Sequence, residues 1–231
     1  MAGADGAEIR ARELRFLASA GAGEVSALLV RPADARWLLV LAHGAGADMR
    51  HVFMEGAAQA LAAEGVATFR YQFPYTERGR RRPDPRPLLL ATVRSALGAA
   101  AREAGDLPLL AGGKSMGGRM TSLAAAEGGL PGVQGIVFFG FPLHPAGKEA
   151  AAAERAAHLA EVALPMLFLQ GSRDRLARLE LLRPVHARLA PRATLHVVAD
   201  ADHGFHVPKR SGRTDADIQN ELARTTRAWL E

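Results

Sequence analysis

Apolar runs alternate with stretches of helical periodicity along most of this 231-residue chain. Continuous apolar runs, such as residues 37–42, are typical of strands buried on both faces of a sheet. The pattern predicts strands over residues 12–17, 25–31, 37–42, 66–73, 107–111, 132–139, 165–170 and 194–199. Apolar residues spaced three and four apart predict helices over residues 51–64, 88–104, 115–127, 147–161, 176–189 and 215–230.

The order of these elements predicts an α/β fold with a mostly parallel sheet of about eight strands. A glycine-rich turn over residues 20–23 predicts that the first two strands form an antiparallel hairpin. From residue 37 onward, strands alternate with helices, so we expect helices on both faces of the sheet. No shift of composition marks a boundary, which predicts a single domain over residues 1–231 with residues 1–10 flexible. About 25 residues follow Phe139 before the next strand, room for a small cover and not for a large cap domain.

The amino-acid composition excludes several kinds of functional site. Hydrophobic residues make up 48% of the chain and charged residues 23%, as in an ordinary globular protein. Cysteine is absent, which excludes disulfides, thiolate metal sites and a cysteine nucleophile. No apolar run approaches the ~20 residues of a membrane span, and the first residues do not resemble a signal peptide. We therefore expect a cytoplasmic protein with no membrane partner.

The net charge of +5 comes mostly from arginines spread along the chain. The one dense cluster lies in a proline-broken segment, residues 76–87, and consists of Arg78, Arg80, Arg81, Arg82 and Arg86. Aromatic residues are sparse and do not alternate with the basic ones, so no stacking surface for nucleic acid is indicated. We expect a solvated loop there and no nucleic-acid partner.

The segment around Ser115 carries the first chemical signal. Gly113, Ser115 and Gly117 form a G-x-S-x-G motif between a predicted strand and a predicted helix. This is the pattern of a nucleophile elbow, a sharp turn that exposes a serine hydroxyl above the carboxyl end of the sheet. The alternative is a glycine-rich turn that holds a phosphate, but the glycine spacing of a P-loop is missing.

Two later strand ends supply the partners that a nucleophilic serine needs. Asp174 follows the strand over residues 165–170, and His203 follows the strand over residues 194–199. Parallel strands end at the same edge of a sheet, and the order Ser, Asp, His is the one expected after a nucleophile elbow. We expect Ser115 as the nucleophile, His203 as the base and Asp174 as the acid that orients it.

Other residues near the last strand could share these roles. Asp200 and Asp202 could orient a histidine, although Asp202 also fits a turn, and His206 could be the base in place of His203. His196 alternates within a strand, which favours packing.

An oxyanion hole needs two N–H donors. One should come from Met116, which follows the nucleophile, and the other from the glycine-rich loop after residue 42, where Ala45 is the candidate. His43, in the same loop, is expected to tie that loop together rather than to catalyse or bind metal. No cofactor and no metal are implied.

Five segments resemble a family of small α/β-hydrolases: residues 41–49, 69–75, 112–119, 168–174 and 202–206. This is the bacterial group similar to the Tex30 and KANSL3 hydrolase-like domain, and more loosely to dienelactone hydrolase. The resemblance implies an α/β-hydrolase fold with nucleophile, acid and base at Ser115, Asp174 and His203. Dienelactone hydrolase itself uses cysteine, so the serine here points to esterase chemistry.

The resulting hypothesis is a serine hydrolase that cleaves small carboxylic esters, with short acyl chains, through an acyl-enzyme. A thioesterase, a peptidase and an acyltransferase would use the same three side chains. A non-catalytic interaction module on a hydrolase fold is the alternative of a different class. The pattern leaves the choice between monomer and homodimer open.

Overall fold

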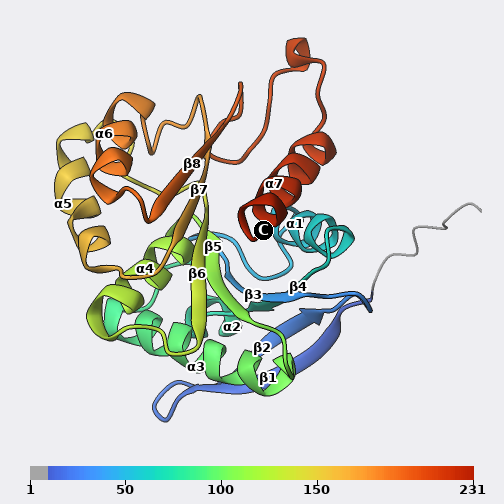
Figure 1. Ribbon diagram of the computed structural model, residues 1–231. Helices are drawn as coiled ribbons and strands as arrows, with labels where there is room; N and C mark the ends of the chain where they lie inside the picture. The colour runs from blue at the N-terminus through green and yellow to red at the C-terminus, as the bar shows by residue number, and fades with distance from the viewer. Residues whose placement is uncertain (1–9) are drawn as a thin grey trace, which may run out of the picture.

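The computed structural model describes residues 10–231, so the flexibility expected for residues 1–10 falls almost entirely outside the described residues. One eight-stranded sheet runs through the molecule (Figure 1). Its strands are β1 (Arg12–Ser19), β2 (Gly23–Val30), β3 (Trp37–Ala42), β4 (Val66–Tyr71), β5 (Leu109–Lys114), β6 (Val133–Phe139), β7 (Met166–Gly171) and β8 (Ala193–Val198). The order across the sheet is β1-β2-β4-β3-β5-β6-β7-β8.

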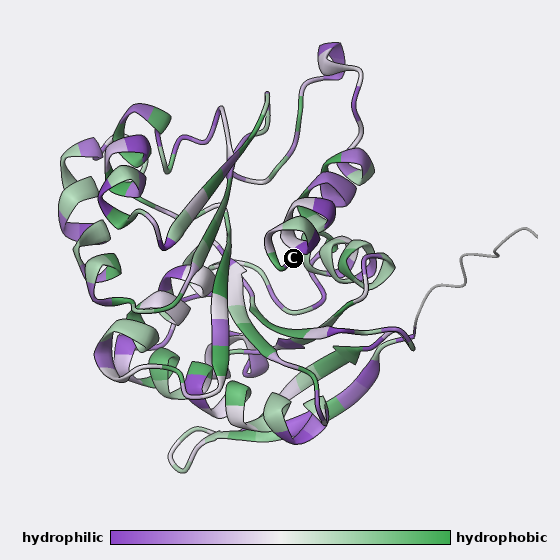
Figure 2. Ribbon diagram, viewed as in Figure 1, coloured by the Kyte–Doolittle hydropathy of each residue, from purple (hydrophilic) through white to green (hydrophobic). Residues whose placement is uncertain are grey.

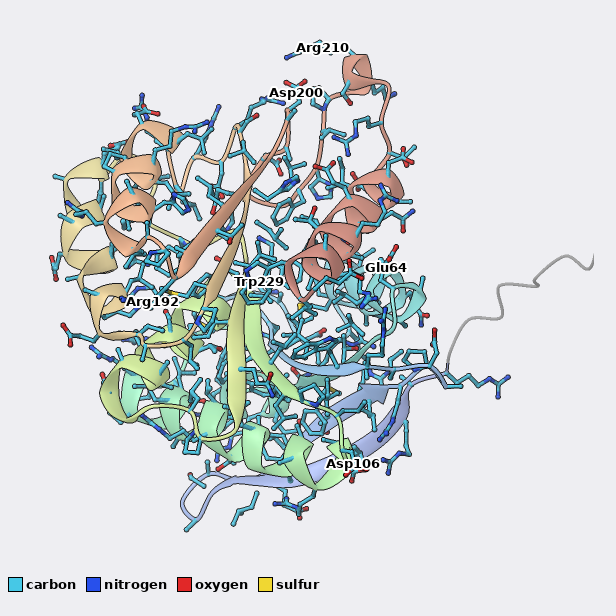
Figure 3. The ribbon with its side chains drawn as sticks, in the orientation of Figure 1. Glu64, Asp106, Arg192, Asp200, Arg210 and Trp229 are labelled. Carbon is cyan, nitrogen blue, oxygen red and sulfur yellow. The ribbon has the colours of Figure 1, made fainter. Side chains whose placement is uncertain are left out.

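The prediction of a mostly parallel sheet with an antiparallel N-terminal hairpin is confirmed. β1 pairs with β2 and β2 with β4 in antiparallel register, and every later pair is parallel. The carboxyl ends of β3, β5, β6, β7 and β8 therefore lie along one edge of the sheet. Figure 3 shows this polarity: Asp106 precedes β5 and lies low in the view, while Asp200 follows β8 and lies at the top.

Helices cover both faces of the sheet, as predicted (Figure 1). The α-helices are α1 (Val52–Ala63), α2 (Pro74–Glu77), α3 (Arg86–Ala104), α4 (Met116–Gly128), α5 (Ala152–Ala156), α6 (Leu179–Leu189) and α7 (Asp215–Trp229). Short 3₁₀ helices are η1 (Glu149–Ala151), η2 (Ala157–Glu161) and η3 (Lys209–Ser211). Helices α1 and α7 pack together on one face, and α3 to α6 lie on the other.

Several boundaries differ from the sequence prediction, and three of the differences bear on the local structure. The helix expected over residues 147–161 is observed as a contiguous helical stretch over residues 149–161, which changes from 3₁₀ (η1) to α (α5) and back to 3₁₀ (η2). The strand expected from residue 107 starts at Leu109, because Pro108 has no N–H to give to the ladder. The arginine segment begins in a helical turn, α2, with Pro74 at its first position.

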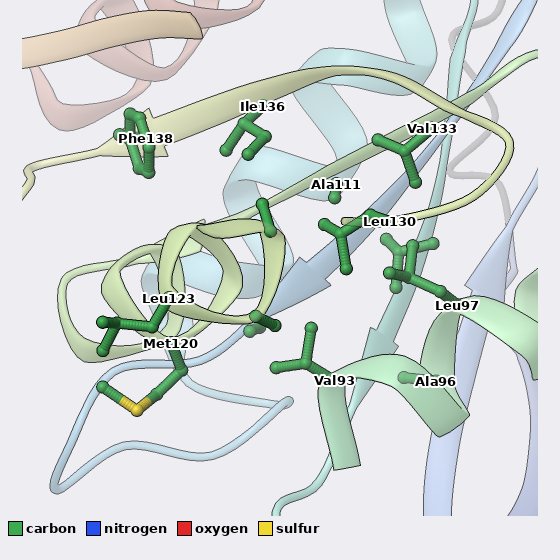
Figure 4. Packing of buried hydrophobic residues seen from close by; sticks show 14 of the residues in the cluster. Val93, Ala96, Leu97, Ala111, Met120, Leu123, Leu130, Val133, Ile136 and Phe138 are labelled. Carbon is green, nitrogen blue, oxygen red and sulfur yellow. The ribbon is translucent and has the colours of Figure 1, made fainter. Parts of the chain in front are cut away.

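Two large apolar clusters hold the layers together, one on each face of the sheet, and a small third one consists of Val30, Ala58 and Ala62. Figure 2 shows the strands as the most continuously hydrophobic part of the ribbon, whereas the helices alternate between polar and apolar residues. On the larger side, Val93 and Leu97 of α3, Leu123 of α4 and Ile136 of β6 belong to one cluster (Figure 4). On the other side, the ring of Trp229 in α7 lies against Gly135 of β6, where a Cβ would come within 2.5 Å of it (Figure 3).

Candidate active site

Ser115 lies on a strained turn between β5 and α4. Its backbone has φ 51° and ψ −116°, a region that a residue with a side chain occupies only where its surroundings hold it there. The backbone is crowded on both sides: a Cβ on Gly113 would lie 2.5 Å from Gly118 N, and one on Gly117 would lie 2.4 Å from Ala42 O. Glycine is therefore required on both sides of the serine, and the turn lifts Ser115 above the end of the sheet.

The structure brings Ser115, His203 and Asp174 into one hydrogen-bonded chain. His203 Nε2 lies 2.8 Å from Ser115 Oγ, and His203 Nδ1 lies 2.7 Å from Asp174 Oδ2. A carboxylate oxygen only accepts, so Nδ1 carries the proton and Nε2 is free to accept the one on the serine hydroxyl. The three residues follow β5, β7 and β8, which are far apart in the chain but end at the same edge of the sheet, with β6 between β5 and β7.

The Asp174 carboxylate is fully enclosed, with none of its side chain exposed. Its Oδ1 accepts the Leu176 N–H at 2.7 Å, and its Oδ2 accepts from the Gln170 side-chain amide as well as from His203. Gln170 is itself held through its Oε1, which accepts the Phe141 N–H at 3.0 Å. The sequence analysis missed Gln170, although an amide ending an otherwise apolar strand was the available signal.

The alternative residues do not join this chain of hydrogen bonds. His206 is exposed and bonds through Nδ1 to Asp215 Oδ2 at 2.8 Å. Asp202 accepts the N–H groups of Gly204 and His206 and so forms the turn that carries His203. His196 was expected to serve packing, but its Nε2 lies 2.7 Å from an oxygen of Glu221. Asp200 stands at the turn after β8 with φ 59°, and its N–H donates to Ser172 Oγ.

The two N–H groups expected to form an oxyanion hole belong to Met116 and Ala45. Met116 opens α4, so its N–H has no acceptor inside the helix. The Ala45 N–H has no acceptor among residues 10–231. Close approach links the two segments, since a Cβ on Gly44 would lie 3.5 Å from the Ser115 Cβ. The loop that carries Ala45 therefore lies against the turn that carries Ser115.

His43 ties the loop after β3 to its neighbours. Its ring is fully buried, with Nδ1 2.8 Å from Gly44 O and with Nε2 accepting the Phe73 N–H at 3.3 Å. Nε2 also lies 3.1 Å from Thr76 Oγ1. Burial lowers the pKa of His43 from its ordinary value of 6.5 to about 4, so the ring is neutral near pH 7.

A pocket of about 430 Å³ opens beside Ser115 and His203, between the loop after β3, helix α1 and the start of α7. Its apolar lining includes the buried Phe53 and Phe205 and the exposed Val52. The rings of Phe53 and Phe205 are stacked, with centroids 5.6 Å apart. Lys114, the residue before the nucleophile, also lines this pocket.

Within residues 10–231, no group of three or more His, Cys, Asp or Glu side chains could hold a metal ion. No helix in the same part of the chain is long and apolar enough to cross a membrane. The arginine segment contributes Arg80 and Arg81 to a separate hollow, which shares Gly46, Ala47 and His51 with the pocket beside Ser115.

The chain is similar to a family of known sequences and to several solved structures. Residues 35–231 match the family model described as alpha/beta hydrolase domain. The structure is similar to dienelactone hydrolase from Anabaena variabilis, with a TM-score of 0.73 and 21% identity over 95% of this chain and 97% of that one. It is also similar to a serine hydrolase without a lid from Xanthomonas campestris, with a TM-score of 0.71 and 20% identity over 95% of each chain. An esterase domain from Rhodothermus marinus gives a TM-score of 0.71 and 16% identity over 95% of this chain and 97% of that one.

Proposed function

The chain belongs to the alpha/beta hydrolase domain family, and we propose that it is a serine hydrolase that cleaves small carboxylic esters. The observation that carries the proposal is the pair of hydrogen bonds that joins Ser115 Oγ to His203 Nε2 and His203 Nδ1 to Asp174 Oδ2. A hydroxyl, a neutral imidazole with a free nitrogen and a buried carboxylate, linked in that order, form the arrangement that activates serine toward acyl groups.

The chemistry follows from the proton positions. His203 Nε2 accepts the proton of Ser115 Oγ while that oxygen attacks the ester carbonyl, and a tetrahedral intermediate forms. The imidazolium then gives the proton to the leaving alkoxide, the C–O bond breaks, and an acyl-enzyme remains on Ser115. Water repeats the attack with His203 again as base, which releases the acid and restores the serine. Asp174 holds the imidazole in the required tautomer and stabilises its charged form.

The oxyanion of each tetrahedral intermediate is assigned to the N–H groups of Ala45 and Met116. Both belong to the backbone, and both are free to donate. Removal of one such donor from a serine hydrolase raises the barrier by about 3–4 kcal/mol. The positive end of the α4 dipole at Met116 acts in the same direction.

The substrate class is assigned from the pocket beside Ser115. A volume of about 430 Å³ lies near the lower end of small-molecule sites, and the apolar wall of Val52, Phe53 and Phe205 suits a small hydrophobic group. Within residues 10–231, the β6–β7 connection contains only η1, α5 and η2, so no large cap is inserted there. These features favour esters with short acyl chains over long-chain lipids.

The test combines covalent labelling with turnover. The wild-type protein is expected to react with a fluorophosphonate probe, and mass spectrometry is expected to find the adduct on the peptide that contains Ser115. The Ser115→Ala variant should lose labelling and should turn over p-nitrophenyl acetate about 10⁶-fold more slowly. Ser95→Ala, a change at a partly buried serine of α3, is the matched control and should behave like the wild type.

Two outcomes would contradict the proposal. A wild-type protein that neither labels nor turns over any ester of a short-chain panel would favour an interaction module. Full turnover by Ser115→Ala would place the nucleophile elsewhere. A panel of thioesters and amides run beside the esters separates thioesterase and peptidase activity from esterase activity, since all three share the acyl-enzyme.

We also propose that the chain belongs to the Tex30- and KANSL3-like group, that it is a cytoplasmic protein, and that residues 1–231 form a single domain. The choice between monomer and homodimer is decided by light scattering.

A further inference from the structure

Lys114 is a buried lysine beside the nucleophile that the proposed mechanism does not use. The chain has three lysines; Lys148 and Lys209 are exposed, whereas Lys114 is 9% exposed. Lysine side chains are almost never buried without a specific partner, because removing an ammonium group from water is costly. Lys114 is therefore expected to have a specific partner at this position.

The ammonium group of Lys114 reaches across the site to the loop that carries His203. Its Nζ donates a hydrogen bond to the backbone carbonyl oxygen of His203. Nζ also lies 5.5 Å from the ring centroid of Phe53 in α1 and 5.3 Å from that of Phe205. Both distances fall within the range of cation–π attraction. One charged group thus connects the end of β5, helix α1 and the loop after β8.

The surroundings leave room for this contact and supply opposite charge. A Cβ on Gly140, at the end of β6, would lie 3.2 Å from Lys114 Nζ and 3.5 Å from His203 Nδ1, so glycine keeps the space open. Burial lowers the pKa of Lys114 to about 8, and the charges of Asp174 and Asp202 act in the opposite direction. The remaining titratable groups around the pocket are His203 in the site and His51, His206 and Asp215, which also line it.

We propose that Lys114 is a positioning residue for the base: its ammonium group holds the main chain of His203 and so keeps the imidazole within hydrogen-bond reach of Ser115 Oγ. The neighbouring rings hold the ammonium in turn. Because lysine occupies the motif position directly before the nucleophile, the same turn that exposes the serine also anchors its base. This inference rests on the proposed function, since it assigns the proton acceptor to His203.

The first experiment compares Lys114→Met with the matched surface variant Lys148→Met. Methionine keeps the length of the side chain and removes the donor and the charge. For Lys114→Met, kcat on p-nitrophenyl acetate should fall about 10- to 100-fold with KM unchanged, because a small displacement of the base slows proton transfer without altering binding. Lys148→Met should match the wild type in both constants, and thermal melting checks that both variants fold.

A chemical rescue separates positioning from packing. The chain has no cysteine, so Lys114→Cys can be alkylated at one site with 2-bromoethylamine in the unfolded state and then refolded. The added arm restores an ammonium group of similar reach, and kcat should return toward that of wild-type protein taken through the same cycle. In the wild type, kcat should decline as pH rises through about 8, where the Lys114 ammonium loses its proton. Lys114→Met should lack that decline, and the alkylated variant should show it at lower pH, since the sulfur atom withdraws electrons from the amine.

A readout that needs no turnover distinguishes this inference from the proposed function. The proton on His203 Nδ1, hydrogen-bonded to Asp174, should give a far-downfield NMR signal in the wild type and in Lys148→Met. Lys114→Met should shift or broaden it. An unchanged signal together with unchanged kcat in Lys114→Met would overturn the positioning role, as would a loss of kcat that alkylation does not restore. A shifted signal in a protein that fails to label with fluorophosphonate would instead contradict the proposed hydrolase function alone.

Discussion

The molecule contains two loops with the same dipeptide, histidine followed by glycine, and they use the imidazole differently. His43 directly follows β3, and His203 follows β8 by five residues. In both rings, Nδ1 faces an oxygen that can only accept and therefore carries the proton. At His43 that oxygen is the carbonyl of Gly44, and at His203 it is the carboxylate of Asp174.

The difference between these partners decides what each ring can do. A carboxylate stabilises the imidazolium that forms when Nε2 gains a proton, whereas a neutral carbonyl in a buried site does so far less. Nε2 of His43 also faces the Phe73 N–H, so a proton there would meet another donor. His203 Nε2 faces a hydroxyl that can release its proton, and 25% of its side chain is exposed. Histidine thus has a structural role in the loop after β3, whereas in the loop after β8 it is the proposed base.

The largest expected effect comes from exchanging each histidine for glutamine. His203→Gln should lower kcat about 10⁶-fold, because the residues of such a triad act as one unit and the serine loses its proton acceptor. His43→Gln should leave kcat within about tenfold of the wild type while lowering the free energy of unfolding by about 1–3 kcal/mol, since a buried hydrogen-bond network is disturbed. Steady-state kinetics and urea unfolding measure the two quantities.

The same two variants can also contradict the assignment of different roles to His43 and His203. If His43→Gln lost as much turnover as His203→Gln without a loss of stability, His43 would have to belong to the reacting groups. Ser95→Ala, used above as a neutral change in α3, gives the baseline for both measurements.

The second-largest expected effect comes from changing Asp174, whose carboxylate faces Nδ1 of His203 as the Gly44 carbonyl faces Nδ1 of His43. Asp174→Asn should lower kcat about 10⁴-fold, because the amide can donate to Nδ1 and so favour the tautomer that cannot accept the serine proton. KM for p-nitrophenyl acetate should change little, since Asp174 is buried behind the imidazole. A loss of kcat below about tenfold would mean that His203 does not depend on the carboxylate.

The sequence allowed the meeting of Ser115, Asp174 and His203 to be predicted because parallel strands end at a common edge. The strand over residues 37–42 was predicted with its observed limits, since an uninterrupted apolar run has few alternatives. The side-chain contacts of Gln170 and Lys114 could not be derived in this way. They depend on the direction of single side chains across three strand ends, which neither periodicity nor spacing records.

The sequence pattern also did not predict the type of every helical segment or the size of the pocket. The alanine-rich stretch over residues 147–161 has high helix propensity and is helical over residues 149–161, but only its middle, α5, is an α-helix, and both flanks are 3₁₀. The pocket beside Ser115 is formed by segments far apart in sequence. Its size depends on how α1 and α7 pack together, which the sequence pattern does not predict.

The smallest effect concerns the acid stability of the buried ring. Burial lowers the pKa of His43 from 6.5 to about 4, so between these values the unfolded chain binds a proton that the folded protein excludes. Stability rises with pH wherever the unfolded state binds more protons, so this group lowers the free energy of unfolding as pH falls from 6.5 toward 4. One proton contributes at most about 1.4 kcal/mol per pH unit.

His43→Gln should therefore flatten the dependence of unfolding free energy on pH across this window, although it is less stable than the wild type near pH 7. Urea unfolding at half-unit steps of pH from 4 to 7 measures both slopes. His158 also has its pKa lowered to about 4 by burial, so the wild-type slope should be steeper than one buried histidine allows, and His43→Gln should retain the part due to His158. Parallel curves for the wild type and His43→Gln would mean that the ring takes up its proton while folded, and the contrast between the two His-Gly loops would lose its electrostatic basis.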